Sequence, residues 1–311
     1  MTEGIEGLFA RTEEFPNSSA RARLAALVGL DDLIDRLATD AVALLDPTTI
    51  QSWSKAVHGE VIPAVTALAD RTPLLVFAGD VGVGKTEVAE VIGQVIATRA
   101  DADVTLYPLS LTARGRGAVG EMTTLLTRAF ERISADFVRA RRSDGTASSL
   151  GVLLIDEADA LAQSRELAQM HHEDRAGVNA LLRGIDGMRT DRLPVLTILC
   201  TNRLDALDPA VQRRAAAIEV FGRPNRAQRF ALLARHLSGA KLSDTEIDGL
   251  AAATGESADR SYGYTYSDLR QRLIPEMVLA AYRHGVALDA LIAHEVLART
   301  PPTRPFEALT R

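Results

Sequence analysis

The sequence predicts an α/β fold, in which a parallel, five-stranded sheet is flanked by helices and followed by a small helical lid domain. Short apolar runs of strand length alternate with helical patterns between residues 74 and 221. One of these runs, Gly151 to Ile155, is continuous, which is typical of a strand covered on both faces. From Gly222 onward the patterns are helical only. We therefore expect an arm at residues 1–21, a large α/β domain at 22–222 and a lid at 223–311.

The composition indicates which kinds of partner the protein can bind and in which cellular compartment it is expected. The chain has 311 residues and a formal net charge of −6. A negative net charge argues against nucleic-acid binding, although a local basic patch would still allow it. A single cysteine, Cys200, excludes an internal disulfide and fits a reducing cytosol. The first residues lack the basic and apolar regions of a signal peptide, and no apolar run approaches the ~18 residues of a membrane span. We expect a soluble, cytoplasmic protein that does not contact a membrane.

The segment before the first strand of the sheet has a helical pattern. Leu33, Ile34, Leu37, Ala41 and Leu44 share one stripe of a helix that Pro47 ends. Two shorter helical pieces are expected at 48–57 and 61–69.

A glycine-rich loop that can bind phosphate follows the apolar run Leu74 to Phe77. Residues 79–86 fit the pattern G-x-x-x-x-G-K-[ST], and an apolar helical pattern follows them. Glycines let backbone N–H groups surround phosphate oxygens at the start of a helix. Lys85 can then reach the β- and γ-phosphates, and the Thr86 hydroxyl can ligate Mg²⁺. A flexible glycine-rich turn is the alternative, but the strand before it and the helix after it argue against that interpretation.

The remaining elements alternate as the fold class requires. Strands are expected at 103–109, 151–155, 195–200 and 217–221, and helices at 121–139 and 172–188. In the lid, Ser243 and Glu246 indicate a capping box. Leu269, Leu273, Met277 and Ala281 indicate a further helix, and residues 288–297 another.

An acidic pair closes the strand at 151–155. Asp156 stands at the carboxyl end of this strand, where a carboxylate can hold Mg²⁺ beside a phosphate loop. Glu157 need not ligate the metal, so it can take a proton from the water that attacks the γ-phosphate. The alternative is an acidic pair that merely ends a strand.

Three further groups are candidates for contacts with phosphate. Asn202 follows the strand at 195–200 and can act as a sensor, although an asparagine there is often only a turn residue. Arg213 and Arg214 end a short helix; they can be a solvated face, or arginine fingers that reach the phosphate bound by a neighbouring subunit. Arg270 opens a lid helix and can contact the γ-phosphate of its own subunit.

Other residues are better explained as structural. His171 to Asp174 are adjacent on a helix and do not face the same way, so we expect no metal other than Mg²⁺. Tyr262, Tyr264 and Tyr266 fit a packed extended segment better than a stacking surface.

Together these motifs resemble the AAA+ ATPases. The segments GDVGVGKT, LLIDEADAL, LCTNRLDALDPAVQRR and GYTYSDLR are similar, in that order, to Walker A, Walker B, sensor 1 with arginine fingers, and sensor 2. Within AAA+, the chain most resembles the pachytene-checkpoint ATPases that remodel HORMA-domain proteins, including bacterial relatives in antiphage operons. That closer resemblance depends on LLDPTTIQSWSK, HEDRAGVNALLRGID and RRAAAIEVFGRP, and on an arginine at sensor 2.

The resemblance implies an ATP-hydrolysing, hexameric homo-oligomer that acts on a protein substrate, with ATP and Mg²⁺ as cofactors. It makes Asp156 the metal-organising carboxylate, Glu157 the catalytic base, Asn202 sensor 1, Arg214 the finger with Arg213 beside it, and Arg270 sensor 2. It places the nucleotide against Gly79, Asp80, Val81, Gly82, Val83, Gly84, Lys85, Thr86 and Glu87, with Val28 and Gly29 lining the adenine pocket.

Two features depart from the family pattern. The first pore loop of such ATPases carries an aromatic residue that grips substrate, and Leu111 to Gly117 contains none. Eukaryotic relatives also have a substrate-recruiting N-terminal domain, whereas only the arm at residues 1–21 precedes the ATPase region here. How substrate is gripped and recruited therefore stays open. Two rival functions are also kept: an AAA+ enzyme acting on nucleic acid, and a scaffold gated by nucleotide binding.

Overall fold

The computed structural model describes the whole chain except residues 1–7, 10, 111–120, 141–148, 162–170 and 307–311. It divides into two compact units. The first unit comprises Met1–Ala26, Asp32–Ala78 and Thr86–Val220; the second comprises Leu27–Asp31, Gly79–Lys85 and Phe221–Arg311. The second unit thus combines the C-terminal part of the chain with two short segments from earlier in the sequence. The expected first pore loop, residues 111–117, lies outside the described part of the chain.

The sheet has the strand order β1-β3-β4-β5-β2-β6. Strands β3, β4, β5 and β2 pair in parallel, as the continuous apolar runs predict. The strands are β1 (Glu13–Phe15), β2 (Leu74–Gly79), β3 (Asp103–Ser110), β4 (Ser149–Asp156), β5 (Val195–Thr201) and β6 (Ala217–Phe221). The α/β class and the sheet flanked by helices are confirmed.

The number of strands was predicted wrongly, because the sheet has six strands and not five. The additional strand, β1, lies in the segment expected to be an arm and pairs antiparallel with β3. Only Phe15 of β1 is buried, at 2% exposure, and the other two residues of the strand are glutamates. A strand of three residues with one apolar side chain shows no alternating pattern, so the sequence did not reveal it.

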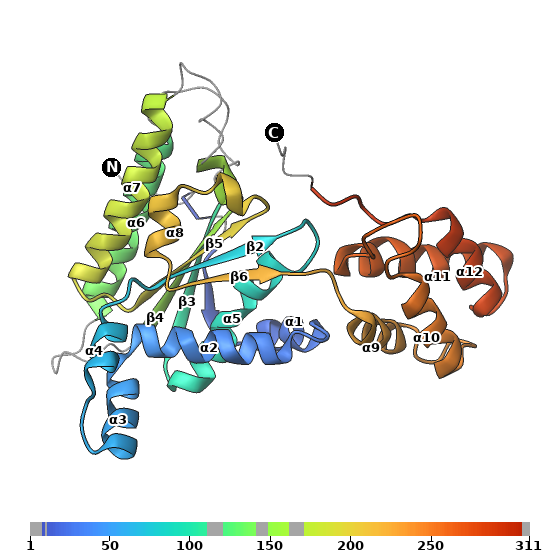
Figure 1. Ribbon diagram of the computed structural model, residues 1–311, viewed down its shortest axis with the longest axis horizontal. Helices are drawn as coiled ribbons and strands as arrows, with labels where there is room; N and C mark the ends of the chain where they lie inside the picture. The colour runs from blue at the N-terminus through green and yellow to red at the C-terminus, as the bar shows by residue number, and fades with distance from the viewer. Residues whose placement is uncertain (1–7, 10, 111–120, 141–148, 162–170, 307–311) are drawn as a thin grey trace. The chain divides into compact units, whose positions relative to one another are not determined.

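Helices α6 (Glu121–Ala140) and α7 (His171–Thr190) lie side by side along one face of this sheet, and α2 (Asp31–Leu45) and α5 (Lys85–Ala100) lie on the other side (Figure 1). One hydrophobic cluster joins α6 and α7 to inward-facing residues of β2, β3, β4 and β5. The remaining helices of the first unit are α1 (Ser18–Ala26), α3 (Pro47–His58), α4 (Pro63–Ala69) and α8 (Pro209–Arg214). Rigid packing on both faces holds the carboxyl ends of the strands in place.

The second unit is helical apart from its loops. It contains α9 (Arg226–His236), α10 (Asp244–Ala253), α11 (Ile274–His284) and α12 (Ala290–Arg299). The capping box of Ser243 and Glu246 at the start of α10 is present as predicted, and Asn225 with Gln228 forms a second one at α9. In the described part of the chain, no helix is both long and apolar enough to cross a bilayer.

A π-helical turn, Asp268–Leu273, precedes α11. The amide of Ile274 donates to the carbonyl of Leu269, five positions earlier in the chain. The next residue, Pro275, has no N–H to donate, so the wider turn satisfies the backbone where a regular helix would lose a hydrogen bond. The apolar spacing predicted a helix here, and only the local pitch differs.

Candidate nucleotide-binding site

The glycine-rich loop at residues 79–86, called the phosphate-type loop below, follows β2. Its backbone geometry requires glycine at two positions. Gly82 has φ +77°, and a Cβ there would lie 2.7 Å from Ser267 Cβ and 2.9 Å from Thr265 Oγ1. Gly79 has φ +145°, and a Cβ there would lie 2.3 Å from the Phe221 carbonyl oxygen. Larger residues would therefore be strained and would clash. The backbone can approach a ligand closely along this loop, as phosphate binding requires.

Lys85 ends the loop and is only 6% exposed. Its ammonium group donates to the carbonyl oxygens of Gly79 at 2.9 Å and of Asp80 at 2.7 Å. These bonds hold the positive charge at the loop itself rather than in solvent. A buried ammonium beside backbone amides and a helix start has the chemistry that an anionic phosphate needs.

In the first unit, the start of α5 meets the end of β4. The Thr86 hydroxyl donates to Asp156 Oδ2 at 3.2 Å, and the Glu157 amide donates to Asp156 Oδ1 at 2.9 Å. A hydroxyl and a carboxylate are the hard oxygen ligands that Mg²⁺ prefers, so this pair fits that ion. The described residues contain no cluster of three or more histidine, cysteine, aspartate or glutamate side chains that would hold another metal.

Glu157 adopts a left-handed backbone conformation with φ +54°, and its side chain is exposed. This conformation is disfavoured for a residue with a Cβ and costs on the order of 1 kcal/mol. Strain of this kind is often found at functional positions. Here it turns the chain sharply after Asp156.

The neighbouring strand β5 ends beside β4, because Ile155 pairs with Leu199. After it, the buried Thr201 hydroxyl donates to Asp159 Oδ1 at 3.3 Å and accepts from the Arg203 amide at 3.0 Å. Asn202 follows Thr201 and is half-buried. The Thr201–Asp159 contact fixes the turn that carries Asn202, and no sequence signal indicated it.

In the second unit, the expected adenine-pocket segment contacts α9. The Gly29 carbonyl accepts a hydrogen bond of 2.6 Å from the Gln228 side chain, and Gly29 has φ +74°. Leu30 is 8% exposed, and its Cδ1 would lie 3.4 Å from a Cβ on Gly84. Val28 is half-buried. The segment 27–31 therefore packs beside the loop within the same unit.

Comparisons with known proteins agree with this geometry. The model of the ATPase family associated with various cellular activities (AAA) matches residues 75–223. CD-NTase-associated protein 6 of Escherichia coli strain MS 115-1 is 50% identical over 302 residues, which cover 97% of each chain. The chain belongs to the AAA ATPase family.

Two solved structures are similar over nearly the whole length of this AAA ATPase. One is the E. coli MS115-1 HORMA:CdnC:Trip13 complex, with 49% identity, a TM-score of 0.88 and coverage of 96% of this chain and 97% of that one. The other is Rhizobiales Trip13, with 39% identity, a TM-score of 0.75 and coverage of 96% and 100%. The resemblance to AAA+ ATPases, and the closer one to HORMA-remodelling ATPases, is confirmed, and the protein is a nucleotide-binding ATPase of this family.

Within the AAA ATPase domain, the two candidate finger residues lie on α8, which Asp208 caps. Arg214 is paired with Asp186 of α7 at 3.6 Å and is 40% exposed. Arg213 is exposed. In the described part of the chain, no hydrogen bond or ion pair joins either arginine to Thr86, Asp156 or Glu157. Their role as fingers stays a prediction.

Arg270 lies in the π-helical turn of the second unit and is half-buried. Burial lowers the pKa of His236 of α9, and the charges of Arg270 and Arg235 lower it further. The assignment of Arg270 as sensor 2, like the roles of Asn202 and Glu87, stays a prediction.

Proposed function

We propose that this AAA ATPase hydrolyses ATP with Mg²⁺ as a homo-hexamer and uses the cycle to remodel a HORMA-domain protein. The observation that carries the proposal is the near-complete match to Trip13 in the HORMA:CdnC:Trip13 complex, at 49% identity over 97% of that chain. The motif residues that the chemistry needs are all present. Because the similarity to that Trip13 covers nearly its whole length and not one domain alone, it supports a partner of the same class, a HORMA-domain protein.

The proposed chemistry assigns one task to each residue. The loop amides and the Lys85 ammonium bind the phosphates and compensate their charge. Thr86 and Asp156 would hold Mg²⁺, which when bound neutralises charge on the phosphate oxygens. The Glu157 carboxylate accepts the proton of the attacking water. Asn202 orients that water or the γ-phosphate.

Arg214 would complete the site from the neighbouring subunit. An arginine finger is worth about 10³ to 10⁵ in rate, so hydrolysis would depend on the assembled ring. The Arg214–Asp186 pair is exposed and therefore weak, since exposed ion pairs contribute about 0–1 kcal/mol. Release of Arg214 toward a neighbouring phosphate would cost little.

A trapping experiment tests the partner. Glu157→Gln should bind ATP and retain the HORMA protein of the same genome in a pull-down, because the cycle stops before release. Lys85→Ala, which cannot hold the phosphates, is the matched control and should retain much less. Equal capture by both variants, or none by either, would contradict nucleotide-dependent engagement of a HORMA protein.

The two rivals have separate tests. An enzyme acting on nucleic acid should turn over faster when DNA is added, and the net charge of −6 argues against it. A nucleotide-gated scaffold should bind ATP without steady-state phosphate release. Turnover that DNA leaves unchanged, and that the HORMA protein stimulates, would favour the remodelling function over both.

A further inference from the structure

The phosphate-type loop contains an acidic side chain of its own. Asp80 directly follows Gly79, and its backbone carbonyl accepts a hydrogen bond from Lys85. Its carboxylate thus lies in the loop whose amides and ammonium group attract phosphate. Like charges at short range repel each other, and they do so more strongly where water is partly excluded. An uncompensated Asp80 would therefore oppose nucleotide binding.

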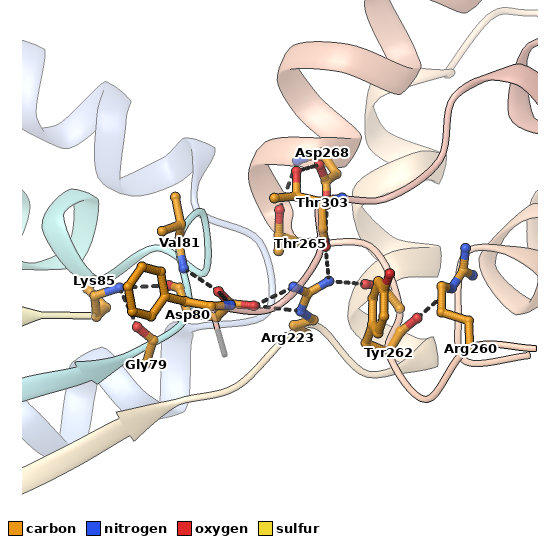
Figure 2. Close-up of polar contacts among 12 residues, drawn as sticks. Gly79, Asp80, Val81, Lys85, Arg223, Arg260, Tyr262, Thr265, Asp268 and Thr303 are labelled. Carbon is orange, nitrogen blue, oxygen red and sulfur yellow. Dashed lines mark hydrogen bonds and ion pairs between the residues drawn. The ribbon is translucent and has the colours of Figure 1, made fainter. Parts of the chain in front are cut away.

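Arg223 supplies the compensating charge, as Figure 2 shows. Its Nε donates to Asp80 Oδ2 at 3.0 Å, and a second guanidinium nitrogen bonds the same oxygen. The two side chains are only 14% and 16% exposed. This exposure is far below that of the ion pair Arg226–Asp248 in the same unit, where the side chains are 59% and 48% exposed. The Asp80–Arg223 pair is largely shielded from solvent, and its geometry is charge-assisted.

Both partners also bind backbone from distant parts of the sequence. Arg223 Nη1 donates to the carbonyl oxygen of Gly263 at 2.5 Å. The same nitrogen donates to the carbonyl oxygen of Thr303 at 2.9 Å (Figure 2). Asp80 Oδ1 accepts from the amides of Val81 at 2.8 Å and Phe306 at 3.2 Å. The pair therefore joins the loop to Arg223 and, through its backbone acceptors and donors, to two later segments of the same unit.

The guanidinium is held in one orientation. Its Cζ lies 5.0 Å from the centre of the Tyr262 ring, which favours a cation over the ring face. The carbonyl of Tyr262 in turn accepts a hydrogen bond of 2.6 Å from Arg260. The planar guanidinium directs its donors to three different acceptors. Lysine has no such planar group, so it would lose part of this network.

We propose that Arg223 is a positioning residue for nucleotide: it neutralises Asp80 and fixes the phosphate loop, so that the loop accepts the triphosphate without repulsion from its own carboxylate. The inference rests on the proposed use of ATP, and it deepens that function by adding a residue that is not among the expected site residues. Arg223 acts through Asp80 and not by touching the reacting atoms.

The test compares four full-length proteins by the Kd for AMP-PNP with Mg²⁺, measured by calorimetry. Arg223→Gln should raise the Kd about tenfold or more, because it leaves one charge uncompensated beside the phosphates. The double variant Asp80→Asn with Arg223→Gln should return most of the lost affinity, since the repelling charge is gone. Arg226→Gln removes a similar but exposed ion pair and should bind like the wild type.

Two further measurements separate this role from a merely structural one. Raising the salt concentration should narrow the difference between Arg223→Gln and the wild type, because screening weakens the repulsion. Arg223→Lys keeps the charge but loses part of the network, so its Kd should lie between those of the wild type and Arg223→Gln. It keeps the proposal testable if Arg223→Gln does not fold.

The opposing outcomes are distinct. Wild-type affinity in folded Arg223→Gln, or loss of all detectable binding by Arg223→Lys, would overturn the inference. A double variant as weak as Arg223→Gln would overturn it too, because Arg223 would then contact the nucleotide directly or act by fold alone. A wild-type protein that binds no AMP-PNP would refute the proposed use of ATP itself, and the inference with it.

Discussion

The Thr86 hydroxyl donates to Asp156 Oδ2 at 3.2 Å, across 70 positions of sequence. This contact joins the first turn of α5 to the carboxyl end of β4. It places two oxygen ligands of the kind that Mg²⁺ prefers within one hydrogen bond of each other. A divalent cation bound here would replace that hydrogen bond with shared coordination.

Removing the Asp156 charge should weaken the apparent affinity of the enzyme for Mg²⁺. In Asp156→Asn, half-maximal ATP turnover should need about tenfold more Mg²⁺ or more, because a charged hard ligand becomes a neutral amide. A titration of phosphate release against Mg²⁺ measures this. Asp136→Asn, which changes a partly exposed ion pair on α6, is the control and should follow the wild-type curve. Equal Mg²⁺ requirements for Asp156→Asn and wild type would contradict the assignment.

Glu157 should matter for turnover but not for nucleotide binding. Glu157→Gln keeps the shape of the side chain and removes its basicity, so we expect the hydrolysis rate to fall by about 10²-fold or more. The Kd for ATP should stay near the wild-type value. Single-turnover phosphate release together with ATP binding measures both. Near-normal turnover would remove Glu157 from the role of base.

The left-handed backbone at Glu157 predicts that glycine can replace it without loss of stability. Glycine adopts φ +54° without steric strain, although it has more conformational freedom to lose on folding. The two effects should leave the free energy of unfolding of Glu157→Gly unchanged, or raise it by up to about 1 kcal/mol. The same protein should hydrolyse ATP very slowly.

The matched control for this prediction is Glu131→Gly, an exposed position inside α6. Glycine inside a helix should lower the free energy of unfolding by about 1 kcal/mol. Urea unfolding curves of the two variants and the wild type give the comparison. If Glu157→Gly lost as much stability as Glu131→Gly, the backbone at Glu157 would not be strained.

The sequence predicted the parts of the site that are encoded in short motifs. Lys85 and Thr86 follow a glycine pattern, and Asp156 ends a continuous apolar strand, so their spacing revealed both their elements and their chemistry. The Asp80–Arg223 pair spans 143 positions, and neither residue stands in a pattern that points to the other. Strand β1 was missed for a similar reason, since its place is decided by pairing with β3 and not by its own three residues. Contacts between distant segments depend on tertiary packing, which periodicity does not report.

A site shared between subunits predicts complementation between two inactive proteins. Lys85→Ala lacks phosphate binding but keeps Arg214, whereas Arg214→Ala keeps the phosphate loop. In a mixed ring, some interfaces would combine an intact loop with an intact arginine, so mixing the two should restore part of the ATP turnover. Each variant alone should be nearly inactive, by about 10³-fold or more for the finger.

Mixing Lys85→Ala with Glu157→Gln is the control for that experiment. Both changes fall in the same half of the proposed site, so no interface would be complete and no activity should return. The phosphate release rate of the mixtures, measured over a range of ratios, distinguishes the cases. Full turnover by a strictly monomeric preparation would exclude a shared site.

The buried carboxylate of Asp268 makes the second unit sensitive to acid. Asp268 is 2% exposed, and this burial raises its pKa. Hydrogen bonds from Thr303, Thr265 and Arg272 lower the pKa by more, so it lies below its ordinary value. A group whose pKa is lower in the folded than in the unfolded chain contributes stability above the unfolded pKa of about 3.9. That contribution is lost as the pH falls through the folded pKa.

Asp268→Asn should therefore lower the free energy of unfolding near neutral pH and flatten its decline in acid. Thr303→Val removes only the Thr303 hydroxyl, which donates to Asp268 Oδ1 at 2.6 Å, so it should give an intermediate slope. Urea unfolding between about pH 3 and pH 7, where carboxylate titration determines the pH dependence, measures the slopes. An Asp268→Asn protein with the wild-type slope below about pH 5 would show that other carboxylates determine the acid sensitivity.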